Sequence, residues 1–110
     1  MPKIIYSSLL FFADGFTVHP SLIVMKPSRR GDEGLLQHEL VHTRQMAKDG
    51  VIAFWLNYLL SRRCRLAYEV EAYKISIKYA PWNVDGFARI LASSYFLGIS
   101  YEQAKAELLA

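Results

Sequence analysis

The sequence predicts an α+β fold, in which a small N-terminal antiparallel β-sheet precedes a bundle of four to five helices. Short apolar stretches fill the first 26 residues, and the turn-forming residues Asp14-Gly15 and Pro20 interrupt them. From residue 33 onward, the apolar residues follow a helical spacing instead. Because the strands come first and do not alternate with helices, the two kinds of element should form separate layers.

The first predicted strand covers residues 3–13 and ends at Asp14-Gly15, a dipeptide that favours a hairpin turn. The opening MPKIIYSSLLFFADG also resembles a short signal peptide, because one lysine precedes a mostly apolar run. It has no small-x-small cleavage site, however, and two serines interrupt the run. We therefore interpret this segment as a buried strand.

Two shorter strands are predicted after the turn, at residues 16–19 and 21–26. Pro20 separates them, because proline has no N–H to donate to a neighbouring strand and therefore lies at a sheet edge or at a break. The polar stretch PSRRGDEG, residues 27–34, is expected to form the loop that leads into the helical part.

Five helices are expected in the remainder of the chain, and capping residues mark several of their ends. Asp32 is a good N-cap for the first helix, and Gly50 a good C-terminal stop. Ser100 and Gln103 form a capping box before the last helix. The expected ranges are 33–48, 51–62, 65–80, 84–97 and 101–109.

The composition describes a packed chain and excludes several classes of protein. A length of 110 residues suits one domain, 1–110, and 53% hydrophobic residues exclude a disordered chain. The net charge of +3 is spread along the chain, without the basic stripe of a nucleic-acid-binding protein. Cys64 is the only cysteine, which fits a reducing compartment such as the cytoplasm. The apolar block 51–60 is half the ~20 residues of a spanning helix, so no stable membrane insertion is expected.

The most informative stretch is HELVHTRQM, residues 38–46. Residues four apart lie on one face of a helix, so His38 and His42 can both present an imidazole nitrogen to one metal ion. Glu39 is turned about 100° from His38, where a carboxylate suits the role of general base toward a water on the open side of the metal. This arrangement of two ligands and a base is typical of zinc hydrolases.

A catalytic zinc site of this kind needs a third protein ligand, and the segment 67–80 offers Glu69 and Glu71. These two residues lie about 200° apart on a helix, so only one can face the metal. Lys74 and Lys78 share the flank of Glu71, which favours a solvated edge there. The pattern therefore favours Glu69 and leaves Glu71 as an open alternative.

The HExxH motif, followed by a glutamate on a later helix, resembles the gluzincin metallopeptidases. The short chain is similar to the minigluzincins and to small HExxHxxQ peptidase-like proteins of bacteria and phages. The matching residues are His38, Glu39, His42, Gln45 and 69–72. In that family the first glutamate of a Glu-x-x-Ala/Ser-Asp motif is the third ligand, which corresponds to Glu69. The resemblance covers roughly residues 16–73 and implies a cytoplasmic, bacterial or phage-encoded protein.

The resemblance also implies where a substrate would lie. The strand before the motif helix forms the upper rim of the cleft in that family, so the edge of segment 21–26 should pair with an extended peptide. One position departs from the family pattern, because Tyr73 stands where the family has an aspartate. A tyrosine hydroxyl or the backbone could then hold the imidazole that such an aspartate would hold.

These observations predict a zinc-dependent peptidase in which His38, His42 and Glu69 hold Zn²⁺. Glu39 would act as base toward the water and then as acid toward the leaving amine. The expected partner is a peptide or protein substrate, with no nucleic acid, and a homodimer is left open.

Two rival interpretations stay open at the level of sequence. The first is a zinc-stabilised binding or assembly module, or a latent peptidase, whose metal site is closed by a fourth ligand. Glu71, His19 or the segment 101–110 could supply that closure. The second rival is a helical packing domain without metal, whose thermal stability would not respond to chelators.

Overall fold

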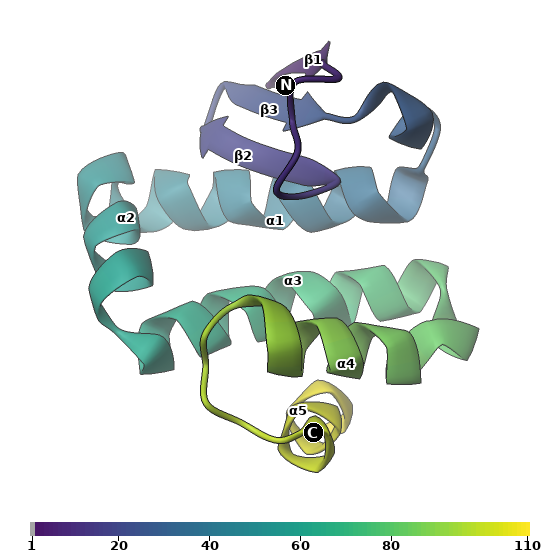
Figure 1. Ribbon diagram of the computed structural model, residues 1–110. Coiled ribbons are helices and arrows are strands. Elements are labelled where there is room, and N and C mark those ends of the chain that lie inside the picture. Colours follow the sequence, from purple (N-terminus) through teal and green to yellow (C-terminus); the bar gives the residue numbers. More distant parts are fainter. Residues whose placement is uncertain (1) are drawn as a thin grey trace.

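The computed structural model describes residues 2–110 and confirms the α+β class, with a three-stranded sheet followed by five helices (Figure 1). Two short 3₁₀ turns, Pro27–Arg29 and Pro81–Asn83, precede α1 and α4. The strands are β1 (Lys3–Tyr6), β2 (Gly15–His19) and β3 (Leu22–Met25). The helices are α1 (Glu33–Asp49), α2 (Val51–Leu60), α3 (Arg62–Tyr79), α4 (Val84–Ser94) and α5 (Tyr101–Leu109).

The sheet has the order β1-β3-β2, which corrects the expectation of an all-antiparallel sheet. Strand β2 is antiparallel to β3, whereas β1 is parallel to β3. The hairpin therefore lies between β2 and β3, at Pro20-Ser21, and the prediction of a hairpin turn at Asp14-Gly15 was wrong. A parallel pair needs a crossover connection, and here the chain crosses from β1 to the far side of β3 before β2 begins.

The first strand is also shorter than predicted, because it ends at Tyr6 and not at residue 13. The apolar residues after it are not buried in a sheet, since Leu9 and Phe11 are 84% and 86% exposed. The apolar composition of residues 7–13 suggested a buried strand, but these residues form a connection in which most apolar side chains are exposed. Phe12 of this connection packs edge-to-face on Phe16 of β2, with 5.2 Å between the ring centroids.

Helix boundaries follow the capping chemistry. The Asp32 side chain accepts a hydrogen bond from the Leu35 N–H at 3.0 Å, and Gly50 ends α1 with a positive φ of 88°. The capping box of Ser100 and Gln103 is confirmed at the start of α5. Helix α3 begins three residues earlier than predicted, because Ser61 is its N-cap.

The C-terminal end of α4 is also earlier than predicted. The helix stops at Ser94, and Phe96 adopts a left-handed backbone conformation with φ 54°. The carbonyl oxygens of Tyr95 and Phe96 accept hydrogen bonds from the guanidinium of Arg65 in α3. These contacts satisfy carbonyl groups that a continued helix would have used.

The core is divided between two layers, and α1 and α3 face each other across the boundary (Figure 1). Ile23, Met25 and Leu40 fill the space between the sheet and α1. A separate cluster joins α3, α4 and α5 and consists of Tyr73, Ala88, Leu91, Leu97, Ala104 and Leu108. The polar groups of the HExxH motif on α1 therefore lie at the boundary between the two layers.

Among the described residues, no helix is long and apolar enough to cross a membrane.

Candidate metal centre

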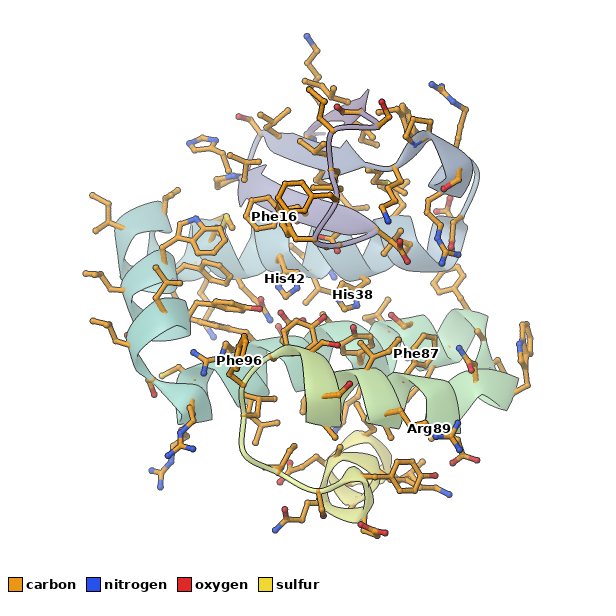
Figure 2. All side chains as sticks on the ribbon, in the orientation of Figure 1. Phe16, His38, His42, Phe87, Arg89 and Phe96 are labelled. Carbon is orange, nitrogen blue, oxygen red and sulfur yellow. The ribbon has the colours of Figure 1, made fainter. Side chains whose placement is uncertain are left out.

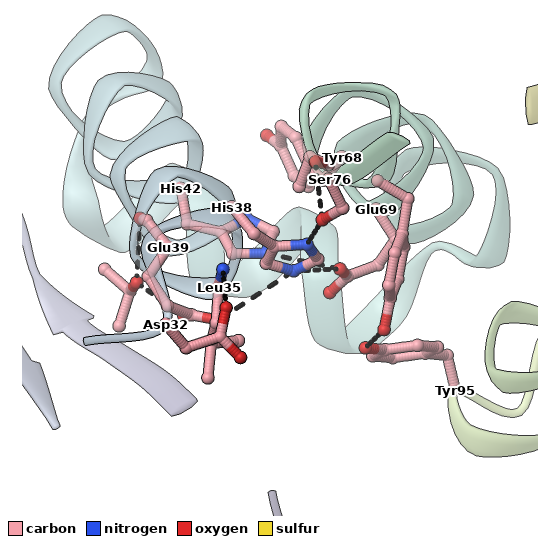
Figure 3. A network of polar contacts seen from close by, with 12 residues as sticks. Asp32, Leu35, His38, Glu39, His42, Tyr68, Glu69, Ser76 and Tyr95 are labelled. Carbon is pink, nitrogen blue, oxygen red and sulfur yellow. Dashed lines mark hydrogen bonds and ion pairs between the residues drawn. The ribbon is translucent and has the colours of Figure 1, made fainter. Parts of the chain in front are cut away.

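Three side chains that the sequence predicted as ligands meet at this boundary. His38 and His42 extend from α1 toward α3 (Figure 2), and Glu69 extends from α3 toward them (Figure 3). Oε1 of Glu69 lies 3.2 Å from Nε2 of His42 and 3.5 Å from Nε2 of His38. One ligand atom from each residue lies within 4.8 Å of the other two. The group could therefore hold a metal ion.

The surroundings of the Glu69 carboxylate also favour the binding of a metal ion. Its side chain is buried, and Oε1 is the one buried side-chain oxygen or nitrogen in residues 2–110 that has no hydrogen-bond partner. An unsatisfied buried carboxylate oxygen is costly unless a cation or a donor completes it. A cation shared by Glu69 and the two imidazole Nε2 atoms would complete it.

Without a metal ion, His42 and Glu69 stabilise each other's charged forms. Burial alone would lower the pKa of His42, but the negative charge of Glu69, whose Oε1 lies 3.2 Å from Nε2, raises that pKa to about 9. Burial would raise the pKa of Glu69, but the nearby His42 and His38 hold it well below its usual range. Protons and a metal ion would therefore compete for the same atoms.

The partner of His38 is Ser76 of α3. Nδ1 of His38 lies 3.1 Å from the Ser76 hydroxyl, and that hydroxyl also donates to the Ala72 carbonyl at 3.5 Å. The hydroxyl oxygen can then accept from Nδ1–H, which leaves Nε2 free to bind a metal. Tyr73 does not hold an imidazole through its hydroxyl, which contacts the Tyr95 hydroxyl at 2.6 Å. The expectation of a tyrosine or backbone partner was therefore wrong for His38.

The partner of His42 is Gln45, one turn further along α1. Nδ1 of His42 lies 2.8 Å from Oε1 of Gln45, and Gln45 donates from Nε2 to Glu71 Oε1 at 2.7 Å. Glu71 therefore contacts the glutamine and not the ligand cluster. Of the two glutamates that the sequence left open, Glu69 is the one that lies with the histidines.

Tyr58 was not among the residues singled out from the sequence, although it contacts the candidate ligand Glu69. Its hydroxyl donates to Glu69 Oε2 at 2.5 Å from the neighbouring helix α2. Burial and the charge of Glu69 both raise the pKa of Tyr58 above its usual range, so the hydroxyl stays protonated as a donor. Tyr58 lies within an apolar block, and its spacing from Glu69 gives no local signal of this contact.

Glu39 lies beside the cluster and is held by strand β2. The Thr17 hydroxyl donates to the Glu39 carboxylate Oε1 at 2.8 Å and to the Glu39 carbonyl at 3.0 Å. Glu39 Oε2 lies 3.8 Å from His38 Nε2. The backbone of Gly15 approaches so closely that a Cβ there would lie 3.2 Å from Cγ of Glu39. The Glu39 carboxylate is thus held in place beside the ligand cluster.

A cleft of about 1210 Å³ runs between the two layers and includes the ligand cluster. Aromatic side chains line it, among them Phe16 and Trp55, whose rings contact each other, and Phe87, whose ring contacts Tyr73. His19 does not contribute to the cleft, because it is exposed and its Nδ1 contacts the Ser21 hydroxyl at 2.8 Å. Helix α5 packs on α3 and α4 and does not line the cleft.

The expected substrate strand needs correction. Segment 21–26 contains β3, which is the central strand of the sheet, so both of its edges are already paired. Strand β2 is the strand beside the cleft, and within the described residues its outer edge is unpaired.

The chain matches no protein-family model, no curated protein and no solved structure.

Proposed function

We propose that this protein is a zinc-dependent peptidase of the gluzincin type, in which His38, His42 and Glu69 hold the metal and Glu39 is the general base. The observation that carries the proposal is the position of Glu69 Oε1, which is buried without a hydrogen-bond partner and faces both imidazole Nε2 atoms. A resident cation would contact this oxygen and both imidazole nitrogens at once, which would complete the coordination of a buried polar oxygen.

The donor set favours zinc. Two imidazole nitrogens and one carboxylate oxygen are the ligands of a catalytic zinc site that leaves its fourth position open. Sites for magnesium and calcium use oxygen ligands instead. The opening of the ligand cluster into a cleft supports an accessible fourth position.

The role of Glu39 follows from its place beside the ligands. When bound, zinc would lower the pKa of a water and polarise the peptide carbonyl. Glu39 Oε2 lies 3.8 Å from the candidate ligand atom His38 Nε2, and from there it would accept the proton of the attacking water. The hydrogen bond from Thr17 to Oε1 fixes the orientation of the carboxylate. Glu39 then donates the proton to the leaving amine.

The substrate is best accommodated as an extended peptide along β2. This strand lines the cleft, and its outer edge offers unpaired backbone groups to an added strand. Gly15 and Thr17 of β2 also contact Glu39, so a peptide bound there would lie beside the base.

The positions of the other candidate ligands speak against a closed zinc module. Glu71 is engaged with Gln45, and His19 is bound to Ser21 at the end of β2. Helix α5 belongs to the core with α3 and α4. Within residues 2–110, the group of potential ligands contains only His38, His42 and Glu69.

The test compares zinc-loaded wild type with Glu39→Gln on a fluorescently labelled unfolded protein. We expect the wild type to cleave it. The variant should keep its zinc but lose activity by about 10²- to 10⁴-fold, because it lacks the proton acceptor. Glu33→Gln, at an exposed glutamate of the same helix, is the matched control and should stay active. No cleavage by the zinc-loaded wild type, or full activity of Glu39→Gln, would contradict the proposal.

A further inference from the structure

We propose that Gln45, oriented by Glu71, is the positioning residue that sets the proton of His42 on Nδ1 and so prepares Nε2 for the metal. This inference rests on the metal site of the proposed function. It assigns a role to two residues outside the ligand set, neither of which touches the metal position.

Gln45 is a buried glutamine with three polar contacts. Oε1 lies 2.8 Å from Nδ1 of His42, and Nε2 donates to Glu71 Oε1 at 2.7 Å and to the Tyr68 carbonyl at 3.0 Å. Both partners of Nε2 are oxygen atoms that only accept hydrogen bonds, since Glu71 is a carboxylate and Tyr68 contributes its backbone carbonyl. The amide nitrogen of Gln45 must therefore point toward α3.

The orientation of the amide decides which nitrogen carries the proton in the neutral form of His42, the form that binds a metal. With Nε2 of Gln45 turned toward α3, Oε1 faces His42 and can only accept. Nδ1 of His42 is then the donor, and the lone pair of a neutral imidazole lies on Nε2, the atom 3.2 Å from Glu69 Oε1. A flipped amide would present its NH₂ group to Nδ1 and move the proton to Nε2, where it would block metal binding.

His38 has no comparable partner. Its Nδ1 contacts the Ser76 hydroxyl, which can either donate or accept, and the bond from that hydroxyl to the Ala72 carbonyl is long at 3.5 Å. Gln45 has two acceptor contacts that fix its direction, whereas Ser76 has one weak contact. The orientation of the ligand atoms is therefore set more strongly at His42 than at His38.

Helix α3 carries both the candidate ligand Glu69 and Glu71, the residue that accepts a hydrogen bond from the amide of Gln45. Glu69 and Glu71 lie two residues apart, so they leave the helix in nearly opposite directions. Glu69 is buried and faces the cleft, whereas Glu71 is exposed and reaches Gln45 from the outer side. Because Glu71 is exposed, it can be changed without opening a cavity in the core.

The experiment measures zinc affinity by chelator competition and the Co²⁺ absorption spectrum in a set of variants. Gln45→Leu should lose about 10- to 100-fold in affinity, as expected when the hydrogen-bond partner of a ligating histidine is removed. Glu71→Lys should also bind more weakly, because a lysine ammonium would attract Oε1 of Gln45 and favour the flipped amide. Glu71→Gln keeps an acceptor oxygen for Gln45 and should stay within about threefold of wild type.

Glu102→Lys on α5 carries the same charge change as Glu71→Lys at an exposed position away from the site, and should bind zinc like wild type. Thermal unfolding of each variant identifies any that fails to fold. The two Glu71 variants keep the inference testable if Gln45→Leu does not fold. Wild-type affinity in both Gln45→Leu and Glu71→Lys would overturn the inference, and equal losses in Glu71→Gln and Glu71→Lys would overturn the role of Glu71.

Proton NMR of the metal-free chain separates this inference from the proposed function. The Nδ1–H proton of His42 should be protected from exchange in wild type and exchange faster in Gln45→Leu. If wild type binds no zinc but shows this difference, the proposed function fails while the role of Gln45 stands. If wild type binds zinc and the proton exchanges equally in both proteins, the role of Gln45 fails.

Discussion

Oε1 of Glu69 lies 3.2 Å from Nε2 of His42 and has no hydrogen-bond partner. In the metal-free protein the two side chains form a buried ion pair. With a metal ion bound, both would become ligands, and the proton on His42 would have to leave. Several predictions depend on this double use of the same atoms.

The first concerns the pH dependence of stability without metal. The pKa of His42 is raised to about 9, so its contribution to the free energy of unfolding is complete below about 6.5 and is lost as pH rises toward 9. The pKa of Glu69 is lowered, so its contribution is present above about 4.5 and is lost in acid. Urea unfolding of chelator-treated protein should therefore show falling stability between pH 6.5 and 9.

Glu69→Gln is the control for that experiment. Without the Glu69 carboxylate, burial lowers the pKa of His42 and only the smaller contributions of Glu39 and Gln45 oppose it, so the loss of stability between pH 6.5 and 9 should shrink. A variant with the same pH profile as wild type would show that Glu69 does not hold the proton on His42.

The second prediction is that zinc binding releases a proton from His42 at neutral pH. Because the pKa of His42 is about 9 in the metal-free protein, the apparent zinc affinity should rise by about tenfold per pH unit from pH 7 up to 9. Calorimetry in buffers of different ionisation enthalpy measures the number of protons released. Affinity that is independent of pH over this range would contradict the coupling.

The third prediction concerns Gly15, whose backbone lies against the side chain of Glu39. A Cβ at this position would lie 3.2 Å from Cγ and 3.3 Å from Oε2 of Glu39, so Gly15→Ala should displace the carboxylate. If Glu39 is the general base we propose, kcat should fall by roughly 10- to 100-fold, because small displacements of a general base are costly. Zinc content should be unchanged, since the three candidate ligands are not touched.

Gly31→Ala is a comparison for Gly15→Ala that tests the local contact. Gly31 has no atom within 4 Å of an added Cβ, although its φ of 87° means that alanine there is strained. It should lower stability without lowering kcat. Equal kcat values for Gly15→Ala and wild type would show that Gly15 does not position Glu39.

The fourth prediction concerns Tyr58, which donates to the second oxygen of Glu69. Tyr58→Phe should leave this buried oxygen unsatisfied and lower the free energy of unfolding by about 1–3 kcal/mol. Zinc affinity should fall by about tenfold or more, because the ligand loses the contact that orients it. Chemical unfolding and chelator competition measure the two effects.

Tyr79→Phe is the control for Tyr58, because Tyr79 is 46% exposed and its hydroxyl makes no hydrogen bond within residues 2–110. It should change neither stability nor zinc affinity by a measurable amount. If Tyr58→Phe behaves like Tyr79→Phe, the contact between Tyr58 and Glu69 does not contribute to the site.

The sequence predicted the helical part well because its signals are local. Asp32, Gly50 and the pair of Ser100 and Gln103 act on backbone groups within one turn, so their effect can be read without the rest of the fold. Ser61 is a signal of the same kind that was overlooked, which is why α3 begins earlier than predicted. The strands were predicted less well, because the exposed apolar residues Leu9, Phe11 and Phe12 have the composition of a buried strand.

The HExxH spacing by itself determined that His38 and His42 share a face, because the period of a helix requires it. Tertiary structure alone decided which glutamate joins them, since that choice depends on how α3 is rotated against α1. Only the fold brought Thr17 to Glu39, Tyr58 to Glu69 and Gln45 to Glu71. Strand order was likewise undetermined by sequence, because pairing between strands is a non-local contact and the hydrophobic pattern of β3 is compatible with an edge or a central position.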